Sequence, residues 1–181
     1  MSRAMHKRFG LDEKSFKGAF EPLIQPFARN DLTPEEFLQK LIKPLLPDAD
    51  PSKFTFLFNT LPELNYELLS FIKDLKQHYP TYVLSNNFGP VFPNYEKMIP
   101  LAEYFTELLL SHKLNMSKTD DTMWPVIFSR IPYKPAELLF IDNKEKYASL
   151  AKRHGVNTVI FLNNQQVVHD INGVLASKKP S

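Results

Sequence analysis

The sequence contains no cysteine and only five glycines. Without cysteine, neither a disulfide framework nor a thiolate metal site can form, and a reducing compartment fits best. No two glycines lie close together, so the glycine-rich phosphate loop of flavodoxin-like and other nucleotide-binding α/β domains is missing. No stretch reaches the roughly 18 apolar residues of a membrane span, and the N-terminus lacks the apolar core of a signal peptide. We therefore expect a soluble, cytoplasmic protein with no membrane partner.

Charge of either sign is not concentrated in one place. Twenty-two basic and twenty acidic side chains give a formal net charge of +2, and the basic residues are scattered along the chain. Binding to nucleic acid depends on a clustered basic face, so we expect no nucleic-acid partner. With 181 residues and 43% hydrophobic content, the chain is long enough for one core domain and a smaller appendage.

The first part of the chain has helical periodicity. Thr33, Pro34 and Glu36 have the spacing of an N-cap, a first helical residue and a capping box, and apolar residues follow at helical spacing. A second amphipathic helix is predicted after Pro62, and a third between about residues 9 and 27, where Pro22 and Pro26 limit its length. We predict a helical domain over residues 1–78.

From residue 79 onward, short apolar runs alternate with longer polar or amphipathic stretches. The runs are "YVL", "ELLL", "ELLFI" and "NTVIFL". This alternation is typical of a parallel sheet with crossover helices, so residues 79–181 are predicted to form an α/β domain. In such sheets the ligand site lies beyond the carboxyl ends of the strands.

Polar residues stand at those ends. In chain order they are Ser85, Asn86, Asn87, Ser111, Asp142, Asn143 and Asn163, with Lys118 seven residues after Ser111. A serine or asparagine at a strand end commonly forms a turn or a cap, and a loop lysine is commonly a solvated charge. Asp142 follows a buried strand and is either a helix N-cap or a metal ligand. Together, a hydroxyl, an ammonium and a carboxylate at successive strand ends can bind a phosphoryl group and Mg²⁺.

The stretches "YPTYVLSNNF", "SHKLNMSKTDDTMW" and "AELLFIDNKEKYASLAKRHGVNTVIFL" resemble the later motifs of the haloacid dehalogenase (HAD) superfamily. The resemblance is to the branch with a helical cap near the N-terminus, which includes small-molecule phosphatases and the N-terminal phosphatase domain of soluble epoxide hydrolases. It covers about residues 79–162. It implies a Rossmann-like parallel sheet with an N-terminal helical cap, formed here by residues 1–78.

The resemblance also assigns roles. Ser85 and Lys118 correspond to the residues that bind phosphoryl oxygens, and Asn86 and Asn87 lie where substrate would bind. Asp142, with Asn143 in the position of a frequent second acid, corresponds to the Mg²⁺ site. The usual proline after the lysine is Thr119 here.

The first motif of that family, a central apolar strand ending in Asp-x-Asp, has no counterpart in the chain. The sequence Asp48-Ala49-Asp50 follows two prolines that exclude a central strand, so we interpret it as a turn between helices. Without a central strand, two neighbouring strands would expose unpaired edges. An N-terminal extension, a rearranged sheet or another chain would then fill the gap.

Two functions remain open on this evidence. The first is Mg²⁺-dependent hydrolysis of a small phosphorylated metabolite in the complete family form, with the chain as written inactive because its nucleophilic aspartate is missing. The alternative is a non-catalytic HAD-like interaction protein, a pseudoenzyme whose apolar helices at residues 30–78 bind a protein partner.

Overall fold

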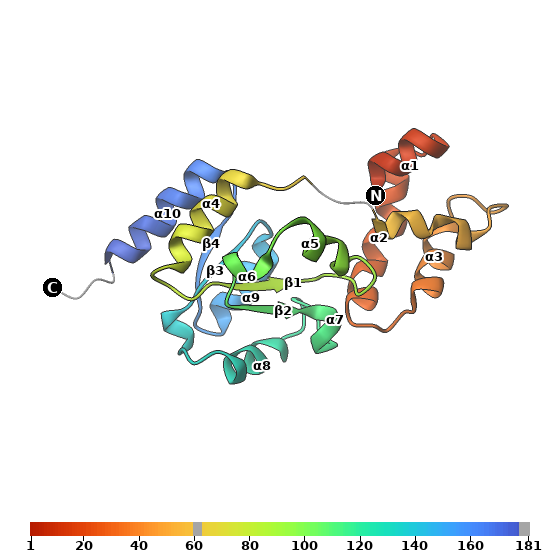
Figure 1. Cartoon of the computed structure of the whole chain (residues 1–181). Helices are drawn as coiled ribbons and strands as arrows, with labels where there is room; N and C mark the ends of the chain where they lie inside the picture. The colour runs from red at the N-terminus through yellow and green to blue at the C-terminus, as the bar shows by residue number, and fades with distance from the viewer. Residues whose placement is uncertain (60–62, 178–181) are drawn as a thin grey trace. The chain divides into compact units, whose positions relative to one another are not determined.

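The computed structural model describes residues 1–59 and 63–177 and divides the chain into two compact units. Unit 1 comprises Met1–Leu64 and Pro80–Ser117, and unit 2 comprises Asn65–Tyr79 and Lys118–Ser181. Each unit combines helices with one pair of parallel strands (Figure 1). The sequence analysis predicted two domains, a cap of residues 1–78 and a core of residues 79–181. The division into compact units does not test it, so it stays a prediction.

Unit 1 begins with helices α1 (Ser2–Phe9), α2 (Glu13–Ala28) and α3 (Pro34–Ile42), followed by the 3-10 helix η1 (Pro51–Asn59). The predicted start of α3 is confirmed, because Thr33 and Glu36 form a reciprocal capping box and Pro34 is the first helical residue. The prediction that Pro22 and Pro26 limit the length of the preceding helix is wrong. The chain breaks at Gly10, which has a φ of 68°, and α2 then continues through Pro22 and Pro26 to Ala28.

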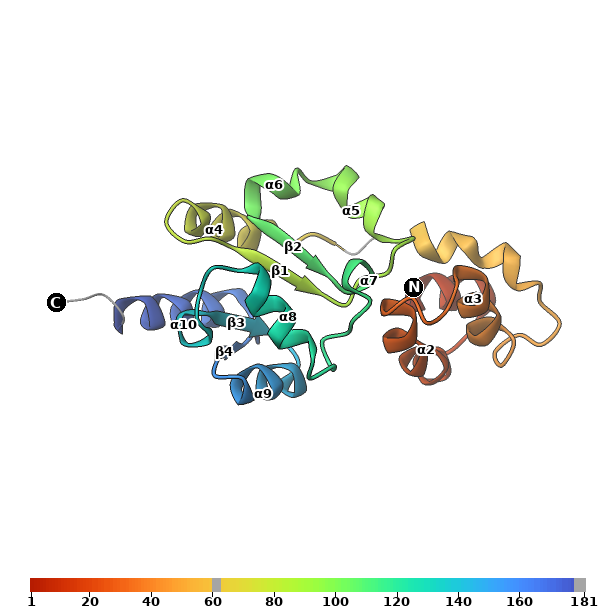
Figure 2. The same ribbon diagram turned by 90° about the horizontal axis from the view of Figure 1, so that it is seen from below.

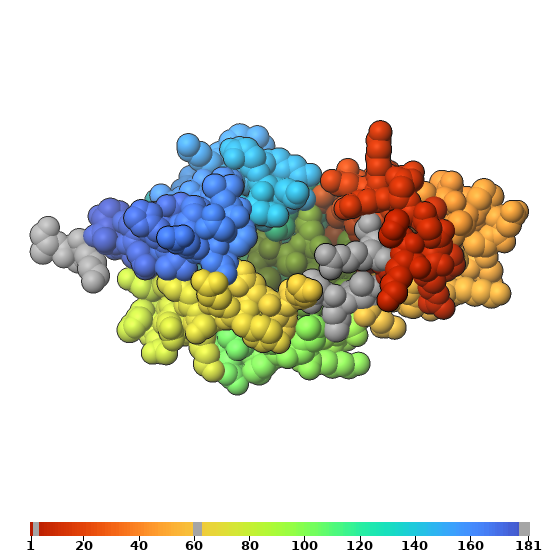
Figure 3. All heavy atoms as spheres, turned by 90° about the horizontal axis from the view of Figure 1, so that it is seen from above, coloured from red at the N-terminus to blue at the C-terminus, as the bar shows by residue number. Residues whose placement is uncertain are grey.

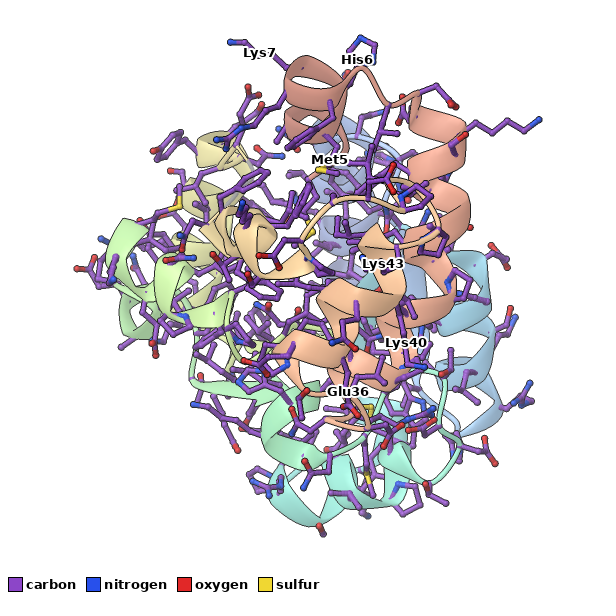
Figure 4. All side chains as sticks on the ribbon, turned by 90° about the vertical axis from the view of Figure 1, so that its right-hand side faces the viewer. Met5, His6, Lys7, Glu36, Lys40 and Lys43 are labelled. Carbon is purple, nitrogen blue, oxygen red and sulfur yellow. The ribbon has the colours of Figure 1, made fainter. Side chains whose placement is uncertain are left out.

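Phenylalanine rings form the core of the helical part of unit 1. Phe37 is fully buried and its ring centroid lies 4.1 Å from that of Phe27. Met5 of α1 is also fully buried and points toward the other helices, whereas His6 and Lys7 point away from them (Figure 4). One face of each helix therefore supplies the core, as the apolar periodicity predicts.

The rest of unit 1 contains the first parallel strand pair. Strands β1 (Tyr82–Ser85) and β2 (Glu107–Leu110) pair with Val83 opposite Leu108. Helices α5 (Phe92–Met98) and α6 (Leu101–Tyr104) form the crossover, and α7 (Ser111–Leu114) follows β2 directly (Figure 2). Both strands form at the predicted apolar runs.

Unit 2 is built from α4 (Tyr66–Lys76), α8 (Met123–Arg130), η2 (Pro135–Glu137), β3 (Leu139–Asp142), α9 (Glu145–Arg153), β4 (Asn157–Ile160) and α10 (Asn164–Ser177). Strands β3 and β4 are parallel, with Ile141 opposite Val159. Helices α4 and α10 lie side by side (Figure 3). Gly155 follows α9 and has a φ of 82°, the left-handed conformation that is common for a glycine directly after a helix.

The strands of the described residues form two separate two-stranded ladders, β1–β2 and β3–β4, rather than one continuous sheet. The predicted α/β class with parallel strands is confirmed, and most residues in regular elements are helical. Within residues 1–59 and 63–177, no helix is both long and apolar enough to cross a membrane.

Candidate functional site

The side chains of Lys118 and Asp142 form an ion pair in unit 2. Asp142 is the last residue of β3, and its Oδ2 lies 2.5 Å from Nζ of Lys118. The two side chains are only 14% and 7% exposed. Because water screens such a pair little, the attraction between the two charges is stronger than at the surface. The structure therefore brings together two of the residues that the sequence analysis selected as candidate site residues.

Further contacts hold both members of this pair. The other carboxylate oxygen of Asp142, Oδ1, accepts a hydrogen bond of 2.9 Å from the main-chain N–H of Lys144, just before α9. Nζ of Lys118 lies 5.0 Å from the ring centroid of Tyr147 and 6.0 Å from that of Phe140, within cation–π range. The ammonium is thus placed by a carboxylate and two aromatic rings at the end of a strand.

In unit 1, Ser85 is the last residue of β1, and Asn86 and Asn87 follow it. Ser111, which is fully buried, donates from its Oγ to the main-chain oxygen of Ser85 and to Oδ1 of Asn86, each over 2.9 Å. Nδ2 of Asn86 donates to Oε1 of Gln25 in α2 over 3.2 Å. Asn86 is therefore part of a polar network that joins the carboxyl ends of β1 and β2 to the helical part of unit 1.

Ser117 completes that network. Its side chain is fully buried, its Oγ donates to Oε1 of Gln25, and it accepts from Nδ2 of Asn86 over 3.4 Å. Sequence reasoning missed Gln25 and Ser117, because a glutamine inside a helix and a serine in a loop carry no signal of their own. It also missed Tyr147 as a neighbour of Lys118.

Asn87 is bound to the segment that follows β2. Its Oδ1 accepts from the main-chain N–H of Phe88 over 2.7 Å, and its main-chain oxygen lies 3.2 Å from Nδ1 of His112. Burial is the largest influence on His112 and lowers the pKa of its imidazole below the ordinary value of 6.5. The folded state therefore favours the neutral ring.

Replacing His112 with asparagine is expected to reduce the loss of stability on acidification. As the pH falls below 6.5, the unfolded chain takes up a proton at His112 before the folded chain does, so the free energy of unfolding decreases. Asparagine can still donate to the oxygen of Asn87 but does not titrate. Urea unfolding followed at about pH 7.5 and about pH 5.5 measures the difference. If the wild type and His112→Asn lost the same free energy of unfolding between the two pH values, the lowered pKa of His112 would be contradicted.

The described residues around Asp142 offer few ligands for a metal ion. Asp142 offers a carboxylate, and the neighbouring Asn143, which is exposed, offers an amide oxygen. Within residues 1–59 and 63–177, no group of three or more histidine, aspartate or glutamate side chains could hold a metal ion. Mg²⁺ in proteins is commonly held by one or two carboxylates together with substrate phosphates and water. Asp142 and Asn143 could supply one carboxylate and one amide oxygen to such a site, and substrate phosphates and water would have to supply the other ligands.

Two other acidic pairs have structural partners. Asp48 and Asp50 lie in the turn between α3 and η1, as predicted, and Oδ1 of Asp50 accepts from N–H and Oγ of Ser52. Asp120 and Asp121 follow Lys118 at the place where the resemblance implies a helix N-cap, but this expected capping role of Asp121 is wrong. Helix α8 begins at Met123 with no side-chain cap, and Asp121 binds Nε2 of His154 over 2.9 Å instead.

The sequence matches no protein-family model, and no curated protein is significantly similar to it. Solved structures are similar in fold. A HAD-like family hydrolase from Porphyromonas gingivalis superposes with a TM-score of 0.76 and 21% identity, over 99% of this chain and 90% of that one. YfnB from Bacillus subtilis, a HAD-hydrolase bound to magnesium, gives a TM-score of 0.73 and 16% identity, over 94% and 88%.

A HAD family enzyme from Bacteroides thetaiotaomicron in complex with magnesium and inorganic phosphate is also similar. It superposes with a TM-score of 0.65 and 20% identity, over 81% of this chain and 83% of that one. Identities near 20% establish a common fold and do not carry an activity across. The chain therefore has a HAD-like hydrolase fold.

Proposed function

We propose that this chain is the phosphoryl-binding part of a Mg²⁺-dependent HAD-type phosphohydrolase, of the capped phosphatase branch, that acts on small phosphorylated metabolites. The observation that supports this most directly is the buried pair of Lys118 and Asp142 at the carboxyl end of β3. A mostly desolvated ammonium beside a strand end is suited to neutralising a phosphoryl group. Magnesium and inorganic phosphate in a solved protein of similar fold agree with this chemistry.

In this proposal each residue has a separate task. Lys118 binds a phosphoryl oxygen, the hydroxyl of Ser85 donates to another, and Asn86 and Asn87 border the substrate. Asp142 and Asn143 would hold Mg²⁺, which when bound supplies positive charge to the phosphoryl group. Because Lys118 is held against two aromatic rings and a carboxylate, its ammonium needs little rearrangement to meet an anion.

The proposed reaction also needs a nucleophile that these 181 residues do not provide. The one Asp-x-Asp sequence, Asp48-Ala49-Asp50, lies in a turn between helices, and Oδ1 of Asp50 already accepts a hydrogen bond from the N–H of Ser52. Covalent phosphoryl transfer in this chemistry uses a carboxylate that attacks phosphorus and is released by water. We therefore expect the chain to bind phosphate without turning over phosphomonoesters.

Phosphate affinity tests the proposal. Titration of the purified chain with inorganic phosphate in the presence of MgCl₂, followed by calorimetry, is expected to show binding that weakens at least about tenfold in Lys118→Met, as for the loss of one charge-assisted contact. Lys146→Met is the matched control, because Nζ of Lys146 lies at the same 5.0 Å from the Tyr147 ring as Nζ of Lys118. It should change the affinity less than about twofold.

Turnover is measured separately with para-nitrophenyl phosphate. No release of nitrophenol above the buffer rate is expected from the chain alone. Turnover by the wild-type chain that Asp142→Asn abolishes would refute the claim that the chain lacks a nucleophile. It would still support the proposal that the chain is a phosphohydrolase. Equal phosphate binding by wild type, Lys118→Met and Lys146→Met would contradict the proposed site.

A second candidate function is a non-catalytic HAD-like protein that binds a protein partner. The observation in its favour is that both carboxylate oxygens of Asp142 already have partners within unit 2, Lys118 and the N–H of Lys144. Such a pair can serve stability alone. Absence of phosphate binding, with MgCl₂ leaving the thermal unfolding temperature unchanged, would favour this function.

A further inference from the structure

The ring of Tyr147 holds the ammonium groups of two lysines. Nζ of Lys118 and Nζ of Lys146 each lie 5.0 Å from its ring centroid. Neighbouring residues of a helix do not face each other, so the side chain of Lys146 has to bend toward the ring of the next residue of α9. The face of an aromatic ring is partially negative and attracts both cations. The ring therefore helps to fix the position of both ammonium groups.

The two ammonium groups differ in their other contacts. Lys118 is 14% exposed and forms an ion pair with Asp142. Lys146 is exposed, and in the part of the chain that the structure describes its side chain forms no ion pair. The carboxylate that precedes it in the sequence, that of Glu145, accepts instead from Oγ of Ser149 over 3.5 Å, one turn further along α9. Lys146 thus offers solvent an ammonium that an aromatic ring holds and no carboxylate neutralises.

The separation of the two lysines suits a ligand with two negative groups. Because each Nζ lies 5.0 Å from the same centroid, the two cannot be more than twice that distance apart. Like charges at such a separation repel each other at physiological ionic strength, where the Debye length is about 8 Å. A ligand that brings one anionic group to each ammonium removes this repulsion. Each anionic oxygen would lie about 2.8 Å from its ammonium.

We propose that Lys146 binds a second anionic group of the substrate, a carboxylate, while Lys118 binds the phosphoryl group. This inference rests on the proposed function, because it needs a phosphoryl group at Lys118. A carboxylate carries one negative charge, which one lysine can balance, whereas a second phosphate would carry about −1.5 to −2 at pH 7. The substrate class is then a small phosphorylated carboxylic acid, with a few carbon atoms between its two anionic groups.

Two ligands that differ at one carbon test the second group. The compounds 3-phosphoglycerate and glycerol 3-phosphate share a three-carbon skeleton and a phosphoryl group, but the first has a carboxylate where the second has a hydroxymethyl group. Calorimetry with MgCl₂ is expected to show about fivefold tighter binding of 3-phosphoglycerate, as for one added ion pair at an exposed site. This preference should shrink in about 0.5 M NaCl, because salt screens exposed charges.

Substitutions assign the preference to one side chain. Lys146→Met is expected to abolish it while changing the affinity for glycerol 3-phosphate less than about twofold. Lys146→Arg keeps the positive charge and should retain most of the preference. Lys144→Met is the matched control, because Lys144 is also exposed but is held to Asp142 through its main-chain N–H. It should leave the preference unchanged. Both lysines are exposed, so these variants are expected to fold.

The outcomes distinguish this inference from the proposed function. Equal affinity of the wild-type chain for the two ligands, or a preference that survives Lys146→Met, would overturn the carboxylate site and leave phosphate binding by Lys118 intact. If Lys146→Met weakened the binding of inorganic phosphate as much as that of 3-phosphoglycerate, both lysines would bind one phosphoryl group, and the inference would be wrong. Failure of all three ligands to bind would contradict the proposed function and this inference with it.

Discussion

Replacing Phe37 with alanine is expected to lower the free energy of unfolding of unit 1 by about 4 kcal/mol. The ring is fully buried and lies 4.1 Å from the Phe27 centroid, 5.9 Å from that of Phe58 and 6.1 Å from that of Phe88. Alanine removes these contacts and leaves a cavity that rigid aromatic neighbours cannot fill. Hydrogen exchange of α3 amides in native conditions measures the loss.

Phe9→Ala is the control for this substitution. Phe9 also contacts an aromatic ring, that of Phe54 at 4.9 Å, but it is 39% exposed. The loss should be less than half that for Phe37, because partly exposed rings remove less area from water on folding. The only tryptophan, Trp124, belongs to unit 2, so its fluorescence shows whether unit 2 is affected. Equal losses for the two substitutions would mean that Phe37 is not in the core.

Removing either partner of the Lys118–Asp142 pair alone is expected to lower the free energy of unfolding by about 3 kcal/mol. Lys118→Met leaves the carboxylate without its cation, and Asp142→Asn leaves the ammonium without its anion, in side chains 14% and 7% exposed. The remaining charge then loses its partner while still largely shielded from water. Urea unfolding followed by Trp124 fluorescence reports the change, since Trp124 packs on Phe140, two residues before Asp142.

The double variant Lys118→Met with Asp142→Asn measures how much of the stability comes from the interaction between the two side chains. Its loss of stability should be smaller than the sum of the two single losses by more than about 1 kcal/mol, because no unpaired charge remains. Additive losses would mean that each residue acts alone. The stability result and the phosphate result are independent. A coupled pair that binds no phosphate would favour the non-catalytic function.

Local structure in this chain was predictable from local sequence. The capping box of Thr33 and Glu36, the left-handed Gly155 and the four strands at their apolar runs depend on residues within a few positions of one another. Each follows from backbone geometry or from apolar alternation. The predictions failed for Asp121, which binds His154 and does not cap α8, and for Pro22 and Pro26, which lie inside α2.

The candidate site was predictable in its residues but not in its contacts. Ser85 and Asp142 could be selected because each follows an apolar run, and the carboxyl ends of parallel strands are where ligand sites form. Lys118 could be selected only from its spacing after Ser111 and from the resemblance to the family. The polar network of Asn86, Gln25 and Ser117 could not be predicted, because it joins residues up to 92 positions apart. No short sequence pattern encodes such a distance.

The sequence by itself determined the element order, the helical and α/β segments, and the polar residues at the strand ends, because periodicity and turn chemistry act over a few residues. Only the tertiary structure decided that Asp142 pairs with Lys118, that Asn86 is held by Ser111 and Gln25, and that the strands form two separate ladders. Burial and hydrogen bonding between distant segments are properties of the packed chain.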